Sequence, residues 1–332
     1  MVVKSYFNVH KSYVLLVVLL FLVIYDISLG SLDVSWSSIW KSLFDYNPND
    51  SEELTVRIFR IPRVLTAVFA GMALAVSGLL MQTLFQNPLA GPYVLGINSG
   101  ASLAVAITTM TGLQFFSSYA GIFGSAIIGA LIAGAIIVLC SLYVRSKVSL
   151  LLVGIMLGSF AGALVNVIQS YSNPEDIKVF LLWSFGSLQN SSPEQLKYLI
   201  LFITTGLILT IFLIKPLNIL VLGDQDAKLL GVNLKQVRLL LILITAILTG
   251  VVTAYCGPIA FIGLIVPNII KFIYKSANHG QLLIGSALGG GILLVLCDIL
   301  MQLSLPYFIL PLNAITALIG APIIIWIIIK RF

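Results

Sequence analysis

Long apolar runs separated by short polar segments extend along the whole chain. A helix that crosses a bilayer needs about 20 mostly apolar residues. By that criterion the sequence predicts ten membrane-spanning helices, over residues 13–30, 62–84, 93–111, 118–144, 148–169, 196–214, 239–256, 258–274, 281–303 and 312–329. Glycine and proline interrupt the third and the eighth of these runs. The pattern therefore predicts an all-α, polytopic membrane protein in which residues 1–332 form a single transmembrane domain.

The composition agrees with this pattern. Hydrophobic residues make up 59% of the 332 residues and charged residues only 9%, whereas a soluble domain has about 25% charged residues. We therefore expect the chain to lie in a lipid bilayer, and the composition excludes a soluble enzyme, a disordered regulator and a nucleic-acid-binding domain. The net charge of +6 is then expected to reflect cytoplasmic loops.

The first apolar run has two interpretations. Lys4 and Lys11 precede it, and the small residues around Ser28-Leu29-Gly30 follow it, as in a cleaved signal peptide. The run nevertheless continues at full membrane length, while the apolar part of a signal peptide is shorter. This favours a membrane-spanning helix.

The distribution of lysine and arginine predicts the orientation. With the N-terminus inside, 12 of the 18 basic residues fall in cytoplasmic segments and six in outer segments, so both termini are expected in the cytoplasm. The predicted outer face is acidic except at Arg57, Arg60 and Arg63. An exposed basic cluster on an acidic face favours docking of an acidic partner. The alternative is that these arginines only anchor the second helix at the membrane interface.

A comparison of the chain with itself at an offset of 179 residues indicates an internal repeat. Six of the 24 positions from 65 to 88 are identical to their counterparts, and the matches include Gly71 with Gly250 and Pro88 with Pro267. An odd number of spans separates the copies, so the repeats, approximately residues 62–169 and 239–329, are predicted to be inverted, as in many transporters. The alternative is that unrelated membrane helices share small residues for close packing.

Each copy also ends in a stretch broken by glycine and proline, at residues 87–92 and 257–268. Irregular backbone at membrane depth is tolerated only where it is buried in protein or lines an aqueous cavity. The paired breaks therefore predict a transport pathway between the two halves.

The chain has no motif that would supply energy from a nucleotide. No G-x-x-x-x-G-K-[ST] phosphate loop occurs in it, so we do not expect it to hydrolyse ATP by that route. Asp298 is the one ionisable residue deep in a predicted span, and it either couples transport to an ion or makes a structural hydrogen bond to a neighbouring helix. The three cysteines and two histidines have no metal-ligand spacing.

A polar segment at residues 215–238 is the longest predicted cytoplasmic loop between spans. Residues 222–232 within it are expected to form a short helix between glycines, with Asp224 as its cap. A short amphipathic helix on the cytoplasmic side suits docking into a groove of a partner.

Several stretches between residues 55 and 329 together resemble one family. The chain resembles the FecCD-type permease subunits of ABC importers for iron-siderophores, haem or cobalamin, and the resemblance is carried by Arg60-Ile61-Pro62-Arg63, Asn87-Pro88-Leu89-Ala90, Gly186-Ser187-Leu188, Leu222-Gly223-Asp224, Leu230-Gly231-Val232, Gly257-Pro258-Ile259 and Gly320-Ala321-Pro322.

The resemblance implies a transport subunit that is not itself an enzyme. It implies a type II importer in the cytoplasmic membrane, with a homodimer of ten-span subunits, two cytoplasmic ATPase subunits and an extracytoplasmic substrate-binding protein. ATP and Mg²⁺ would bind to the ATPase, so no cofactor is expected in this chain. Arg60 and Arg63 would receive acidic residues of the binding protein, with Arg57 a weaker candidate. The family's coupling helix would comprise Leu222, Gly223, Asp224, Ala227, Leu230, Gly231 and Val232.

The same resemblance implies two constrictions of the pathway. Asn87, Pro88 and Leu89 match the inner gate, and Ser146-Lys147 match a second constriction. The alternatives are that Asn87 caps a helix and that Lys147 is only a topology-determining charge. Amide side chains, not charges, would line the path, with Asn98, Asn166 and Asn313 as candidates.

The sequence departs from the family pattern at Gln86, at Asn268 and Lys271, at Gln302, and in the opening of the last span, Leu310-Pro311-Leu312-Asn313. These departures leave the transported chelate and a third docking contact undefined. The alternative function is an ion-coupled secondary transporter that uses Asp298.

Overall fold

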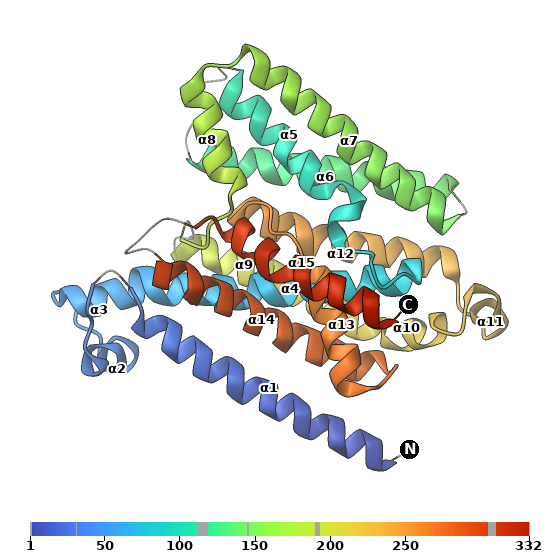
Figure 1. Cartoon of the computed structure of the whole chain (residues 1–332), viewed down its shortest axis with the longest axis horizontal. Coiled ribbons are helices and arrows are strands. Elements are labelled where there is room, and N and C mark those ends of the chain that lie inside the picture. The colour runs from blue at the N-terminus through green and yellow to red at the C-terminus, as the bar shows by residue number, and fades with distance from the viewer. Residues whose placement is uncertain are drawn as a thin grey trace.

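The computed structural model of the chain describes residues 2–30, 32–111, 119–144, 146–189, 193–304 and 310–331, and within these ranges all regular structure is helical. Figure 1 shows the elements, which are α1 (Val2–Ser28), α2 (Trp36–Phe44), α3 (Ser51–Thr55), the π-helical turn η1 (Val56–Arg60), α4 (Ile61–Phe85), the 3₁₀ turn η2 (Pro92–Leu95), α5 (Ile97–Met110), α6 (Tyr119–Tyr143), α7 (Lys147–Tyr171), α8 (Pro174–Ser184), α9 (Pro193–Phe212), α10 (Ile214–Leu220), α11 (Asp224–Leu229), α12 (Leu234–Cys256), α13 (Ile262–Tyr274), α14 (His279–Ser304) and α15 (Leu312–Arg331).

Each of the ten predicted spans contains a helix. Among the described residues, eight helices are long and apolar enough to cross a membrane, and α5 and α13 are shorter, with 14 and 13 residues. The third and eighth predictions are therefore wrong in extent, since these helices begin at Ile97 and Ile262, not at residues 93 and 258. Both follow a residue with a left-handed backbone, Gly96 (φ 70°) and Phe261 (φ 68°), which ends any helix that approaches from upstream.

The second broken stretch is shorter than predicted. Only residues 257–261 are non-helical, and α13 continues through Pro267. Proline has no N–H to donate to Gly263, one turn earlier. The α4 helix approaches most closely at this carbonyl, because a Cβ atom on Gly78 would lie 1.7 Å from the Gly263 oxygen. The side chains of Gln82 and Asn268 donate to the neighbouring carbonyl of Leu264.

The core is built around α4. This helix packs against α9, α12, α13 and α14, and it lies between α1 on one side and the α5–α8 group on the other (Figure 1). Its contact with α14 is very close, since a Cβ atom on Gly71 would lie 2.2 Å from the Gly290 carbonyl oxygen. Small residues permit this approach of two backbones, as is typical of membrane helices.

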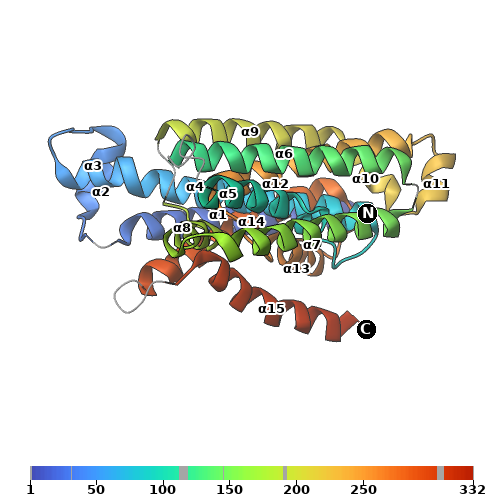
Figure 2. The same ribbon diagram turned by 90° about the horizontal axis from the view of Figure 1, so that it is seen from above.

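The ends of the molecule carry the short helices. Figures 1 and 2 place α2 and α3 at one end, which we call the α3 end, and α11 at the opposite end, the α11 end, together with both chain termini. The predicted loop 215–238 is largely helical, because it contains α10, α11 and the first residues of α12, which begins at Leu234, before the predicted residue 239. Figure 2 shows α15 on an outer face of the molecule.

Candidate functional site

The predicted gate residues lie in a loop directly after α4. Gln86 ends α4 with a left-handed backbone (φ 49°), so the cap of this helix is Gln86, and the alternative prediction that Asn87 caps it is wrong. The Asn87 Oδ1 atom instead accepts the N–H of Leu89 at 2.9 Å, and Asn268 Nδ2 donates to the Pro88 carbonyl at 2.8 Å. The gate loop, residues 86–91, is therefore fixed both internally and to α13.

A cavity of about 510 Å³ separates the gate loop from α7. Asn87, Leu89 and Tyr93 line one wall, and residues of the first half of α7, among them Leu151, Ile155 and Ser159, line the other. The cavity thus has one wall that continues α4 and one wall that belongs to α7.

The three predicted pathway amides lie away from this cavity. Asn98 accepts a hydrogen bond from Thr253 of α12 at 2.9 Å, and Asn166 is exposed on α7. Asn313 is the second residue of α15. Its side chain accepts the N–H of Ala260 at 3.2 Å, and its own N–H donates to the Phe185 carbonyl at 3.0 Å. Asn98 and Asn313 therefore make contacts between different elements of the protein. The side chain of Asn166 is instead exposed on the surface of α7.

The predicted short helix is present within residues 222–232 as α11, which is limited to Asp224–Leu229. Gly223 (φ 111°) precedes it and Asp224 is its first residue, so the prediction that Asp224 caps the helix is wrong. At its other end Gly231 (φ 81°) donates to Lys228 and Val232 donates to Ala227, a Schellman motif that requires a residue such as glycine at positive φ.

The two faces of α11 differ. Ala227 is buried against the rest of the protein, whereas the apolar side chains of Leu222, Leu229 and Leu230 are exposed, Leu229 by 86%. Exposed leucines on a short helix outside the membrane-spanning part suit insertion into a groove of another protein.

The first residue of α7 contacts α11. The Lys147 Nζ atom lies 2.7 Å from Asp224 Oδ1, and Arg238 of α12 is 4.0 Å from the other carboxylate oxygen. Ser146 caps α7 by accepting the N–H of Ser149 at 3.3 Å. Lys147 therefore has a specific partner, which the alternative of a simple topology charge did not predict.

The three arginines near the α3 end have different surroundings. Arg57 is exposed, and its guanidinium lies 4.3 Å from the centre of the Tyr46 ring. Arg60 is buried and donates to the carbonyls of Ile27, Ser28 and Leu32, at and beyond the C-terminus of α1. Arg63 binds Asp298 of α14. Of the three, Arg57 is the exposed one.

Asp298 is therefore not an isolated charge. Besides Arg63, it accepts a hydrogen bond from Gln302 at 3.2 Å, and the same Gln302 amide donates to Asp26 of α1. Asp26 is itself buried, with 1% of its surface exposed. A recess of about 470 Å³ opens beside this cluster and is lined by Asp26, Phe59, Arg60, Arg63, Gln189 and Gln302, among others.

Comparison with known proteins identifies the family. The model of the FecCD transport family matches residues 17–330. The chain belongs to the FecCD transport family. The hemin transport system permease protein HmuU of Yersinia pestis is 37% identical over 324 residues, which cover 96% of this chain and 94% of the relative. The Fe(3+) dicitrate transport system permease protein FecD of Escherichia coli K12 is 33% identical, covering 92% and 93%.

Two further FecCD comparisons agree. The vitamin B12 import system permease protein BtuC of Salmonella typhi is 36% identical over 84% of both chains. A solved ABC transporter described as metal-chelate type and inward-facing is 28% identical, covers 97% of this chain and 99% of its own, and has a TM-score of 0.85. The chain is thus the permease subunit of an ABC importer and carries no ATPase domain. The alternative of an ion-coupled carrier finds no support, because the chain matches ABC importer permeases over nearly its whole length.

Proposed function

We propose that this chain is one half of a homodimeric, ten-span type II permease that carries a metal chelate of the iron-siderophore, haem or cobalamin type across the cytoplasmic membrane. Hydrolysis of ATP in two partner ATPase subunits, which bind the nucleotide and Mg²⁺, would drive the transport. The observation that carries this proposal is the match over nearly the whole chain to permeases named for hemin, ferric dicitrate and vitamin B12.

The packing of the helices supports two inverted repeats, approximately residues 62–169 and 239–329. If α4 corresponds to α12 and α6 to α14, then each contact should occur twice. The α4 helix does pack against α14, and α12 packs against α6. The short helices α5 and α13 follow α4 and α12 in the same order along the chain, which also supports the repeat.

The arrangement of the ends supports an orientation with both termini in the cytoplasm. Both termini lie at the α11 end (Figure 1), and Leu229 and Leu230 are exposed there. In the proposed assembly these leucines insert into the ATPase, so the α11 end faces the cytoplasm. The α3 end then faces the binding protein.

We propose that the binding protein docks first on Arg57, the exposed arginine, and places an acidic side chain in the recess beside Arg60 and Arg63. Both of these residues line that recess. Arg60 already donates to three carbonyls inside the protein, so it provides a positive field more than free donors. Arg63 binds Asp298 through Nε and Nη2.

In the proposed pathway the gate loop, with Asn87, Pro88 and Leu89, opens and closes toward α7. Ser146 and Lys147 form the second constriction at the start of α7. Asn98, Asn166 and Asn313 would offer polar contacts without charge, which suits weak and transient contact with a chelate that the binding protein has delivered.

The test is transport in proteoliposomes that contain this chain, its cognate ATPase and its binding protein, with haem, a ferric siderophore and cobalamin as cargo. We expect import of one of them that requires ATP, and ATP hydrolysis stimulated by loaded binding protein. An ATPase variant that binds but does not hydrolyse ATP is the control. Transport by the purified chain alone, driven by an ion gradient, would refute the proposal.

A further inference from the structure

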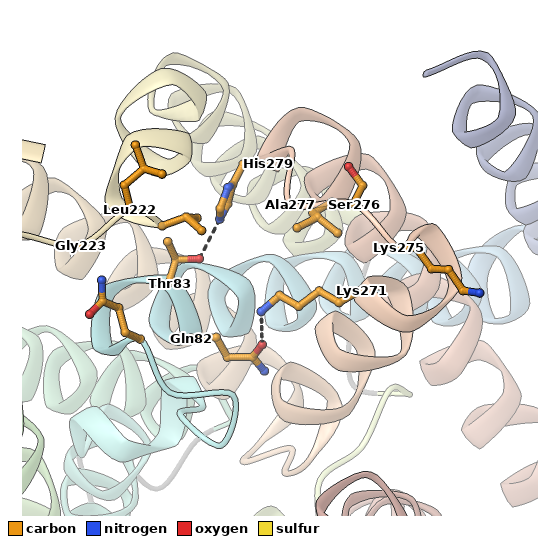
Figure 3. A pocket seen from close by; sticks show the side chains of 12 residues that line it. Gln82, Thr83, Leu222, Gly223, Lys271, Lys275, Ser276, Ala277 and His279 are labelled. Atoms are coloured by element: carbon orange, nitrogen blue, oxygen red, sulfur yellow. Dashed lines mark hydrogen bonds between the residues drawn. The ribbon is translucent and has the colours of Figure 1, made fainter. Parts of the chain in front are cut away.

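A buried histidine connects three helices at the α11 end. His279, the first residue of α14, is 2% exposed. Its Nε2 atom lies 2.8 Å from the Thr83 hydroxyl of α4 (Figure 3), and its Nδ1 atom lies 3.1 Å from Asn218 Oδ1 of α10. The same Asn218 oxygen accepts the backbone N–H of His279 at 2.7 Å. Both ring nitrogens are therefore engaged, one with α4 and one with α10.

A second hydrogen bond joins the same two helices. The Gln86 amide donates to the Leu220 carbonyl, the last residue of α10, at 3.0 Å. One turn earlier Gln82 accepts from Lys271 of α13 at 2.8 Å, as Figure 3 shows. The last turn of α4 is thus bonded to its neighbours through side chains.

These contacts border an open space. Thr83, Gln86 and His279 line a cavity of about 610 Å³ together with Leu222 and Gly223, which lead into α11 (Figure 3). Leu217 and Leu220 of α10 pack into the apolar core, and beside the cavity hydrogen bonds in addition connect α10 with Gln86 and His279. Such bonds have preferred lengths and angles, and a displacement of one partner is passed to the other.

The order of the elements along the chain places these contacts between α11 and the gate loop. Only residues 221–223 separate α10 from α11, and the gate loop begins where α4 ends. We propose that His279 is a positioning residue that transmits movement of α11 to the gate loop, by holding Asn218 of α10 and Thr83 of α4 at fixed distances. This inference rests on the proposed function, because it assumes that the ATPase moves α11.

The other wall of the gate cavity has its own link to α11. Lys147 begins α7 and contacts Asp224 directly, whereas the gate loop is reached through α10, His279 and Thr83. Movement of α11 would therefore act on both walls of the 510 Å³ cavity. With the His279 contacts intact, the gate loop would move when α7 moves. With these contacts broken, α7 would move and the gate loop would stay in place.

The experiment uses the reconstituted complex and counts the ATP molecules hydrolysed per chelate imported. Thr83→Val removes the hydroxyl at nearly constant volume, and we expect it to raise this ratio about five-fold, the size expected for one buried hydrogen bond. His279→Leu should raise it by at least as much, and the double variant should be no worse than His279→Leu, since both changes break the same link.

Two controls separate transmission from packing. Thr83→Ser keeps the hydroxyl and should restore the normal ratio. Thr66→Val removes another buried hydroxyl of α4, which donates to Pro62 within the same helix at 2.7 Å, and should leave the ratio unchanged. Hydrogen exchange in residues 86–91 gives a second readout, because ATP binding should alter it in the unsubstituted complex and not in Thr83→Val.

The outcomes are distinguishable. If the unsubstituted complex imports a chelate and Thr83→Val and His279→Leu both keep its ratio and its exchange response, the inference is wrong and the proposed function stands. If the unsubstituted complex shows no ATP-dependent import, the proposed function fails, and the inference fails with it.

Discussion

Arg63 of α4 binds both carboxylate oxygens of Asp298 of α14, with Nε 2.8 Å from Oδ2 and Nη2 2.7 Å from Oδ1. The Asp298 side chain is fully buried and that of Arg63 is 11% exposed. The pair connects α4 and α14 near the α3 end, while Gly71 and Gly290 bring the same helices together along their length. It gives the buried carboxylate of Asp298 a partner on a neighbouring helix.

The first prediction concerns this pair. Asp298→Leu should lower the free energy of unfolding by about 3–5 kcal/mol, because it leaves the Arg63 charge buried and unpaired. The double variant Arg63→Leu with Asp298→Leu should have a free energy of unfolding closer to that of the unsubstituted protein. Thermal unfolding in detergent measures both variants. Equal losses of stability in the single and the double variant would show that the pairing of the two charges does not stabilise the fold.

The second prediction concerns docking at the α3 end. Arg57→Glu should weaken association with the binding protein about ten-fold at low ionic strength, with a smaller effect at high salt, because Arg57 is exposed and acts by long-range attraction. Surface plasmon resonance at two salt concentrations checks this. Lys178→Glu, at an exposed lysine of α8, is the matched control. Unchanged binding of Arg57→Glu would exclude Arg57 from the interface.

Arg60 is a poor probe of the same surface. Its guanidinium binds carbonyls at the C-terminus of α1, where a cation also interacts favourably with the helix dipole. Reversing its charge would detach α1 from the start of α4, so a loss of docking would follow from a change of fold.

Local pattern predicted the elements that depend on neighbours in sequence. Apolar runs of membrane length gave the positions of the long helices, and Gly231 ends α11 as its residue type suggests. The helices α2, α8 and α10 are too short for a criterion based on membrane thickness, so they were missed. Asp224 has the chemistry of a cap, but the chain turns one residue earlier, at Gly223.

Partners distant in sequence could not be predicted in the same way. Arg63 and Asp298 are separated by 235 positions, and Thr83 and His279 by 196. No period or spacing connects such residues, because their contact depends on how α4 packs against α14. One signal was available for Asp26, since an acidic residue within an apolar helix is expected to have a buried partner.

The third prediction concerns the close approach of α4 and α14. Gly290→Ala should strongly reduce the yield and thermal stability of folded protein, because its Cβ atom would lie 2.1 Å from the Gly71 carbonyl oxygen and the helices must separate. Gly162→Ala in α7 is the control, since no atom lies within 4 Å of its added Cβ. Size-exclusion chromatography and thermal unfolding measure both, and a stable Gly290→Ala protein would contradict the packing described.

The last prediction concerns the contact between α7 and α11. Lys147→Met removes the charge that faces Asp224 at 2.7 Å and keeps most of the apolar stem. Because Asp224 is 36% exposed, solvent screens the pair, and its contribution should be at most about 1 kcal/mol. We therefore expect a moderate rise, about two- to five-fold, in ATP hydrolysed per chelate imported.

Salt and a conservative variant identify the cause of that rise. High ionic strength should produce part of the same loss of coupling in the unsubstituted complex and little further loss in Lys147→Met, since screening acts on the charge pair. Lys147→Arg retains the charge and should preserve coupling. If Lys147→Met and Lys147→Arg behave alike, then side-chain shape and not charge connects α7 to α11, and the ion pair would have no part in moving the second wall of the gate cavity.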